Sequence, residues 1–331
     1  MGLLVGIDEA GYGPHLGPLV VAAAAIDFPG DRLPDPDLWD ALAPNVCKRP
    51  ARRQPHVLVC DSKLAYAGGG DLAALERTVL GFLAVGGVRP PTLADLQSAT
   101  APHPPAAGDG AVSNGAAASE PWHRPESVAL PASTAAAEIE AAADCLRHAL
   151  ASIGAVPAGL WVNVASAARL NHLMDGDRNK AGALFYLASD LLAAAQARCP
   201  DRPIHVTMDR HGGRRYYGEL LSGAFPMTPV ETVSEAPEKS RYRLLRGPAA
   251  TVDLTVCERC EDWSLVTALA SMAAKYVREL HMAQLNDYFR SRVPGLRPTA
   301  GYGLDAWRFL DDVAAARVSA GVPDTAILRN R

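Results

Sequence analysis

Apolar segments of strand length alternate with segments of helical periodicity along this chain. Two apolar runs, residues 3–8 and 17–26, are separated by a short glycine-rich turn, which predicts that they are antiparallel neighbours in a sheet. Further strand-like runs lie at 57–60, 160–165, 204–209 and within 230–256, and helical spacing covers 71–85, 134–153, 180–199 and 263–289. The alternation predicts an α/β fold, in which a mixed sheet is flanked by helices and a helical C-terminal region spans about 263–331.

One stretch departs from this pattern. Residues 89–133 are rich in Pro, Ala, Gly and Ser, a composition that buries too little apolar surface to offset its ordering entropy. We predict an inserted loop or linker there, within a single domain over residues 1–331. With 331 residues, of which 49% are hydrophobic and 21% charged, the chain is long enough to build one large core.

Charge and cysteine content narrow the functional classes. A formal net charge of -4 argues against a generally basic nucleic-acid coat, so any nucleic acid has to be held by local patches. The sequence contains neither a membrane-length apolar run nor a basic segment followed by an apolar signal core, and we expect a cytoplasmic monomer with no membrane contact. Six scattered cysteines fit a reducing compartment, and the single C-x-x-C at Cys257 and Cys260 is interpreted as two ordinary thiols.

Acidic residues recur where apolar elements end. They are Asp8 with Glu9, Asp61, Asp209, and Glu261 with Asp262. Carboxylates from separate strand ends can converge at one edge of a sheet, where they do not all stay ionised unless a cation neutralises them. Hard oxygen ligands select Mg²⁺ or Mn²⁺. Taken singly, each acid can instead be a helix cap or turn residue.

Several motifs resemble those of the ribonuclease HII family, the type 2 ribonucleases H. The opening GIDEAGYGPHLGPLVVAAA is similar to the family's Asp-Glu-Ala-Gly-Arg-Gly signature, and ALASMAAKYVREL at 268–280 to its Ala-Ala-Ser-Ile-x-Ala-Lys helix. CDSKL at 60–64, ARLNHL at 168–173 and GYG at 301–303 resemble weaker family motifs in the same order. The resemblance covers roughly two-thirds of the chain.

The resemblance implies a ribonuclease H-like fold and a metal-dependent endonuclease. Such an enzyme cleaves the RNA strand of an RNA–DNA hybrid, or cuts at a ribonucleotide embedded in a DNA duplex, with two Mg²⁺ or Mn²⁺ ions as cofactors. Asp8, Glu9 and Asp209 match the first three metal-binding acids. The fourth position falls on Glu261 or on Asp262, and both stay open as catalytic ligands.

The same resemblance implies the substrate-binding residues. Gly11 and Gly13 match a turn whose backbone approaches the ribose 2′-hydroxyl, the group that distinguishes RNA from DNA, and Tyr302 matches a tyrosine that stacks beside it. Lys63 and Lys275 match motif lysines. Tyr12 stands where the family has arginine, so a phosphate or sugar contact is lost or replaced by stacking. Ala300 precedes Gly301 where the family usually has lysine.

Basic residues also follow Asp209, at Arg210, His211, Arg214 and Arg215. This Gly-containing loop is able to cradle a phosphate, although a solvated turn with an exposed histidine is the alternative.

Two other functions remain open. A protein with the same fold that binds hybrids but has lost cleavage fits the changes at Tyr12 and Ala300. An actin-like or sugar-kinase-type ATPase fits the sequence GIDEAG, but needs a second Asp-x-Gly phosphate turn, which Asp209-Arg210-His211 does not supply.

Overall fold

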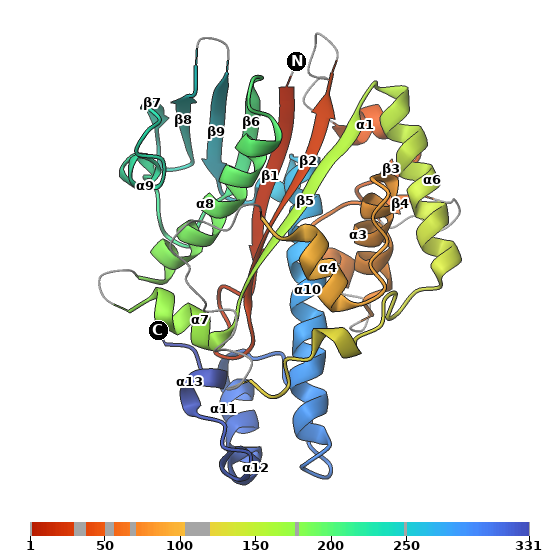
Figure 1. The fold of residues 1–331 in the computed structure, drawn as a ribbon, viewed down its shortest axis with the longest axis vertical. Helices are drawn as coiled ribbons and strands as arrows, with labels where there is room; N and C mark the ends of the chain where they lie inside the picture. The colour runs from red at the N-terminus through yellow and green to blue at the C-terminus, as the bar shows by residue number, and fades with distance from the viewer. Residues whose placement is uncertain are drawn as a thin grey trace.

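The computed structural model describes residues 2–29, 38–49, 56–66, 71–102, 120–175, 179–247 and 250–330. Its centre is a seven-stranded sheet with the strand order β5-β2-β1-β6-β9-β8-β7 (Figure 1). The strands are β1 (Gly2–Ala10), β2 (Leu19–Phe28), β5 (Val156–Ala165), β6 (Ile204–Asp209), β7 (Val230–Glu235), β8 (Lys239–Leu245) and β9 (Thr251–Cys257). The neighbours β1, β6 and β9 are parallel and the remaining pairs antiparallel, so the predicted mixed sheet is confirmed.

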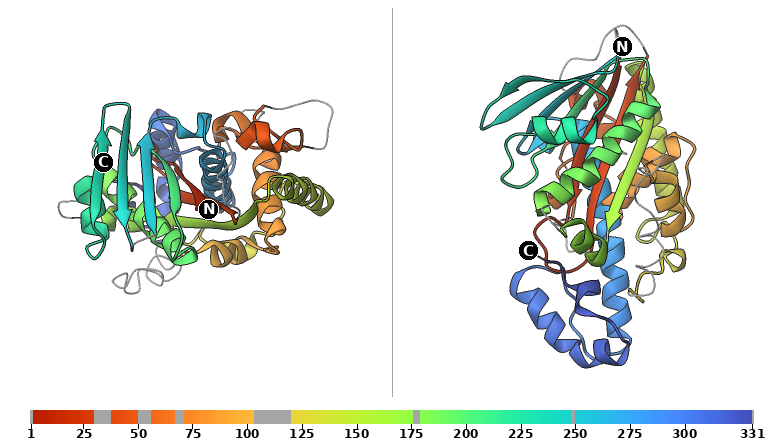
Figure 2. Two further views of the ribbon diagram at one scale, coloured as in Figure 1. Left: turned by 90° about the horizontal axis from the view of Figure 1, so that it is seen from above. Right: turned by 60° about the vertical axis from the view of Figure 1, so that its left-hand side comes forward.

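Helices cover both faces of the sheet (Figures 1 and 2). One face packs against α3 (Ala73–Val85), α6 (Ala136–Ser152) and the long α10 (Leu265–Arg290), and the other against α8 (Lys180–Arg198). Strand β2 explains why both faces are covered: Val20 and Ile26 belong to the first core, and Val21 and Ala23 to the second. A strand that is buried on both sides reads as a continuous apolar run.

The remaining elements are short. They are α1 (Leu38–Leu42), β3 (Val46–Cys47), β4 (Val57–Leu58), α2 (Ser62–Tyr66), α4 (Leu93–Thr100), η1 (Pro125–Ser127), α7 (Ala167–Leu173), α9 (Gly218–Ala224), η2 (Cys260–Asp262), α11 (Gly303–Asp312), α12 (Ala314–Ser319) and α13 (Asp324–Ile327). The C-terminal helices gather around the end of α10 that extends beyond the sheet (Figure 1). A third core there includes Phe289 of α10 and Phe309 of α11.

Two predicted segments differ from the structure. The apolar run 57–60 contributes only Val57 and Leu58 to a strand, in a two-stranded sheet with β3 outside the main sheet. Helix α4 lies within the stretch that we expected to be a loop or linker, because Thr92 caps its N-terminus through Asp95 N and Leu93 and Leu96 are buried. Residues 103–119 of that stretch lie outside the described residues.

Helix α10 touches the backbone of β1 at Gly6. A Cβ atom at Gly6 would stand 2.1 Å from the backbone nitrogen of Thr267, so any side chain there would push the helix off the strand. This close approach fixes the position of the first turn of α10 against β1, two residues before Asp8. Among the described residues, no helix is long and apolar enough to cross a membrane.

Candidate metal centre

The parallel pairing of β1 with β6 sets two acids side by side. Ile7 is in register with Met208, so the next residues, Asp8 and Asp209, lie next to each other at the carboxyl ends of the two strands. Asp209 is in turn in register with Cys257 at the end of β9. Three adjacent parallel strands therefore end at one edge of the sheet, and the acids sit at that edge.

Three carboxylates meet there. One oxygen from each of Asp8, Glu9 and Asp209 lies within 4.8 Å of the other two. Asp8 is 7% exposed, and Glu9 and Asp209 are half-buried. The structure thus brings together three of the six acids that the sequence singled out, from the ends of two strands.

A hydroxyl pair supports Asp8 from the side of α10. The Ser271 hydroxyl hydrogen-bonds to the Asp8 carboxyl group, and Ser271 Oγ also contacts Ser62 Oγ of α2 at 3.0 Å. The backbone nitrogen of Glu9 donates to Asp8 Oδ1 at 2.7 Å. These contacts fix the orientation of the Asp8 side chain.

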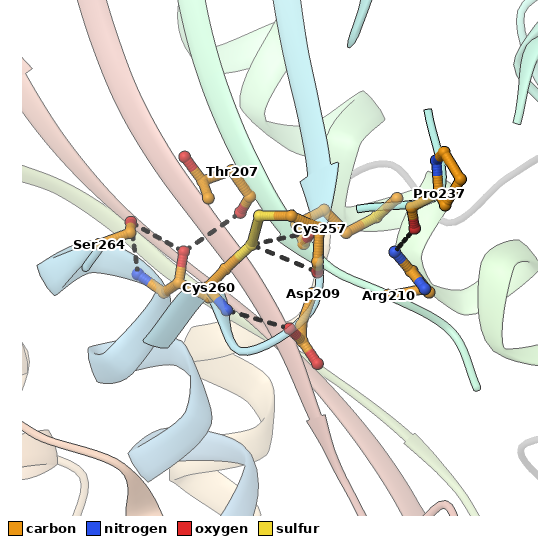
Figure 3. Close-up of a disulfide and its surroundings, with 9 residues drawn as sticks. Thr207, Asp209, Arg210, Pro237, Cys257, Cys260 and Ser264 are labelled. Atoms are coloured by element: carbon orange, nitrogen blue, oxygen red, sulfur yellow. Dashed lines mark hydrogen bonds between the residues drawn. A yellow bond between two sulfur atoms is a disulfide. The ribbon is translucent and has the colours of Figure 1, made fainter. Parts of the chain in front are cut away.

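A disulfide lies directly beside Asp209 (Figure 3). Cys257 at the end of β9 is bonded to Cys260 of η2, and the backbone nitrogen of Cys260 donates to Asp209 Oδ1 at 3.1 Å. The interpretation of these cysteines as ordinary thiols was wrong. Their Cα atoms stand 6.1 Å apart across the turn, a separation that a disulfide spans.

The turn closed by this disulfide carries the two candidates for a fourth ligand. Glu261 is 8% exposed, and its charge is among the causes that raise the pKa of Asp8 and of Glu9. Asp262 is not among those causes; its side chain is 45% exposed and forms an ion pair with Arg259 at 2.7 Å. Glu261 therefore lies closer to the cluster than Asp262 does, although it is not one of the three acids whose oxygens meet within 4.8 Å.

The electrostatics are those of crowded carboxylates, for which the charge of Lys63 offsets only part of the shift at Asp209. Burial and then Asp209 raise the pKa of Glu9 to about 8, and burial with Glu9 and Asp209 raises the pKa of Asp8 well above its usual range. The pKa values of Asp209 and Glu261 are also raised, chiefly by burial. Backbone N–H groups, including that of Cys260, partly offset the shift at Asp209.

This donor set fits a hard divalent cation. All its ligand atoms are carboxylate oxygens, which Mg²⁺ and Mn²⁺ prefer. Glu261 Oε2 is buried and has no hydrogen-bond partner among the described residues, which a buried acid tolerates poorly unless something else compensates it. A cation in this place would supply the missing positive charge.

The glycine turn after β1 lies against the segment that carries Tyr302. Gly11 has φ +90°, and Gly301 O accepts hydrogen bonds from the backbone nitrogens of His15 and Leu16. A Cβ atom at Gly13 would lie 3.6 Å from the Tyr302 ring, which is 47% exposed. The predicted neighbourhood of the glycine turn and Tyr302 is present in the structure.

Tyr12 turns towards the loop after β6. A Cβ atom at Gly212 would lie 2.8 Å from the Tyr12 hydroxyl, and Lys180 Nζ of α8 is 5.1 Å from the centroid of the Tyr12 ring. Burial, and then the charge of Glu9, raise the pKa of Tyr12. Tyr12 thus bridges the glycine turn and the basic loop near the acids.

The two motif lysines differ in their surroundings. Lys63 is exposed, and its charge lowers the pKa of Asp209 against the effect of burial, so the ammonium group lies near the cluster. Lys275 is largely buried, donates to Glu279 Oε1 at 2.7 Å and lies over the Tyr66 ring at 4.4 Å. Lys275 is therefore tied to neighbours one turn of α10 beyond Ser271.

The basic loop after Asp209 is held at its first two residues, while Gly212, Gly213 and Arg215 are exposed. Arg210 pairs with Glu258 at 2.6 Å and also donates to the carbonyl of Pro237 (Figure 3). The expectation of an exposed histidine was wrong, because His211 is 1% exposed and packs against Phe185 and Tyr217. Burial and the charge of Arg214 lower the pKa of His211 to about 3, so its ring is neutral.

Sequence reasoning overlooked three contributors. Ser62 and Ser271 lie inside quoted motifs, and the hydroxyls that flank their acids and lysines were the available signal. Cys260 donates to Asp209 through its backbone nitrogen, and the residue type at position 260 does not predict a backbone hydrogen bond.

Comparisons with known proteins give structural similarities only. No family model matches the chain, and no curated protein matches it. The chain is similar to RNase HII in its PCNA complex from Archaeoglobus fulgidus, at 14% identity and TM-score 0.42, over 99% of this chain and 94% of that one. It is also similar to ribonuclease H2 from Pyrococcus horikoshii OT3, at 11% identity and TM-score 0.39, over 98% and 92%.

Bst-RNase HIII in complex with Mn²⁺ is similar at 14% identity and TM-score 0.41, over 99% of this chain and 66% of that chain. These similarities extend over nearly the whole of this chain, at low identity and with TM-scores below 0.5. Similarity at this level carries no activity with it, and the function has to be inferred from the side chains described above.

Proposed function

We propose that this protein is a metal-dependent endonuclease that hydrolyses the RNA strand of RNA–DNA hybrids, or cuts at ribonucleotides embedded in duplex DNA. The observation that carries the proposal is the meeting of Asp8, Glu9 and Asp209 within 4.8 Å at the ends of adjacent strands. Acids this close, all with raised pKa values, indicate a site that is completed by divalent cations. We expect the protein to act as a monomer in the cytoplasm.

Each residue has a role in this proposal. Asp8, Glu9, Asp209 and Glu261 would hold Mg²⁺ or Mn²⁺, while the turn closed by Cys257–Cys260 holds Asp209 and Glu261 in place. When bound, two such ions would activate a water and stabilise the leaving oxygen of the phosphodiester. Asp262 is left outside the ligand set because its side chain is 45% exposed and paired with Arg259.

Substrate recognition in this proposal belongs to the surface next to the acids. The backbone at Gly11 and Gly13, together with Tyr302, would meet the ribose, where the 2′-hydroxyl distinguishes RNA from DNA. Lys63, beside Asp209, would contact a phosphate next to the cleaved bond. Tyr12 would contribute stacking.

A cleavage assay tests the proposal. An end-labelled RNA–DNA hybrid, a DNA duplex with one ribonucleotide and an all-DNA duplex are incubated with Mg²⁺, with Mn²⁺ and with EDTA. We expect metal-dependent cleavage of the first two and none of the third. Binding of the hybrid without cleavage under any metal would favour a hybrid-binding protein of this fold, the second candidate, which the tyrosine at position 12 makes worth testing.

A further inference from the structure

The buried guanidinium of Arg329 hydrogen-bonds to three carbonyls of the glycine turn. Arg329 Nε donates to the carbonyl of Gly17 at 2.6 Å, and Arg329 Nη1 donates to the carbonyls of Gly11 and of Pro14, the latter at 3.4 Å. Gly11 and Gly17 have φ values of +90° and +78°, which require glycine, so the turn owes its shape to a few positions. Arg329 bonds to the carbonyls at both of these positions.

The chain delivers Arg329 along a fixed path. Figure 1 shows α13 close to α7, and Asn171 of α7 donates to the carbonyls of Thr325 and Leu328 at 3.2 and 2.9 Å. Asn171 Oδ1 accepts from the backbone nitrogen of Asn330 at 2.6 Å. Arg329 itself pairs through its backbone nitrogen with the carbonyl of His15 at 3.0 Å. The residues on both sides of Arg329 are thus anchored.

Arg329 carries a buried charge, which is more costly than an apolar side chain that fills the same space. Its side chain is 3% exposed, no carboxylate pairs with it among the described residues, and Arg329 Nη2 lacks a hydrogen-bond partner among them. Burial, and then the charge of Arg278, lower the pKa of Arg329 to about 9. A buried charge without an ion partner is costly and is offset here by the carbonyls of the turn.

Arg278 approaches the same turn from α10. A Cβ atom at Gly11 would lie 2.5 Å from Arg278 Nε, and the Arg278 guanidinium stands 5.6 Å from the centroid of the Tyr302 ring. Arg278 Nη2 donates to the carbonyl of Ala300 at 3.0 Å. Two buried guanidiniums therefore lie beneath the surface formed by the glycine turn and Tyr302.

We propose that Arg329 is a positioning residue for substrate: by bonding the carbonyls of Gly11, Pro14 and Gly17, it fixes the glycine turn in the shape that contacts the ribose. This inference rests on the proposed nuclease function for the identity of the substrate. Arg329 touches neither the acids nor the exposed face of the turn, so its loss acts on substrate affinity and leaves the metal centre intact.

The test compares Arg329→Lys and Arg329→Gln with wild type. Lysine keeps the charge but not the planar set of donors, so both variants lose most of the carbonyl bonds. We expect KM for the hybrid to rise about tenfold, the cost of one charge-assisted hydrogen bond, with kcat and the Mn²⁺-induced rise in Tm unchanged. Hydrogen exchange of the amides in residues 11–17 should accelerate. Arg317→Gln is the matched control, because Arg317 pairs with Asp324 in the same region without reaching the turn.

The outcomes separate this inference from the proposed function. If KM and hydrogen exchange are unchanged in both variants, the positioning role is overturned. If KM rises while kcat and the Mn²⁺-induced rise in Tm fall to a similar degree, the role of Arg329 is merely structural, which also overturns the proposal. If wild type binds hybrids but cuts none, the nuclease function fails, and hybrid Kd replaces KM in the same comparison. If wild type neither binds nor cuts hybrids, both proposals fall.

Discussion

Replacing Asp8 by asparagine tests the metal centre most directly. Two unit charges 4.8 Å apart repel by about 3.5 kcal/mol at an effective dielectric constant near 20. The apo protein avoids part of this cost by protonating Asp8, as its raised pKa indicates, and asparagine imitates the protonated acid. We therefore expect the metal-free Asp8→Asn variant to be as stable as wild type, or more stable by up to about 3 kcal/mol.

The same substitution should abolish metal-dependent behaviour. At a Mn²⁺ concentration 100 times the Kd, binding stabilises wild type by about 2.7 kcal/mol, and the variant should lose most of this gain. Cleavage of the hybrid should fall by more than about 100-fold. Thermal unfolding with and without Mn²⁺, together with the cleavage assay, measures both effects.

Asp262→Asn is the matched control, because Asp262 has the same side chain next to the same turn but is exposed and paired with Arg259. It should leave the Mn²⁺ response and cleavage within about twofold of wild type, whereas Glu261→Gln should resemble Asp8→Asn. An Asp8→Asn variant that keeps both the Mn²⁺ response and the wild-type cleavage rate would refute the assignment of this cluster as a metal site. Equal losses in Asp262→Asn would refute the choice of Glu261.

Three further predictions follow from the site. Burial and Asp209 raise the pKa of Glu9 to about 8 from its ordinary 4.5, so between these pH values the folded state holds a proton that the unfolded state has released. The stability of the apo protein should therefore fall as pH rises from about 4.5 to 8, and Mn²⁺ should restore it at the upper end. Chemical denaturation across that range, with and without Mn²⁺, measures both effects. Double replacement of Cys257 and Cys260 by serine removes the disulfide from the turn that bonds Asp209 and carries Glu261. The Mn²⁺ affinity should then weaken by roughly tenfold in a calorimetric titration. An unchanged affinity would show that the turn keeps its shape without the disulfide. Tyr302→Ala should weaken the discrimination between a single embedded ribonucleotide and a long hybrid, since the ring lies beside Gly13, and equal ratios of kcat/KM before and after would contradict that role.

The sequence predicted the elements best where burial imposes a clear period. The continuous apolar run of β2 and the long amphipathic α10 were both recognisable, because each is fixed by the sides on which it is buried. The strand expected over 57–60 is only two residues long, and it belongs to a separate two-stranded sheet. An apolar run of four residues reveals neither its length as a strand nor the sheet that it joins. Helix α4 was hidden in a Pro- and Ala-rich stretch, where only the cap at Thr92 marks its start.

The candidate site divides in the same way. Acids at strand ends were visible because a charge next to a buried run needs an explanation. The choice between Glu261 and Asp262 was not visible, because it depends on the direction in which a short turn presents two adjacent side chains. The C-x-x-C was visible, but its spacing alone did not show that the two thiols are bonded. Arg329 was invisible because it acts on backbone groups that are distant in sequence, across 318 residues to Gly11.

Tyr12 stands where the ribonuclease HII motif that the opening sequence resembles has arginine, and the structure places other cations around the glycine turn. Lys180 of α8 lies over the Tyr12 ring, and Arg278 of α10 and Arg329 lie against Gly11. Three cations from α8, α10 and the segment after α13 thus surround the turn, where an arginine within it would have supplied one. Two of them are buried, so their field acts through a low-dielectric interior, where it is screened less than at the surface. Glu279 pairs with Arg278 at 3.0 Å and partly neutralises it, so the positive potential at the turn comes chiefly from Arg329 and Lys180. Tyr12 adds an aromatic face beside these charges.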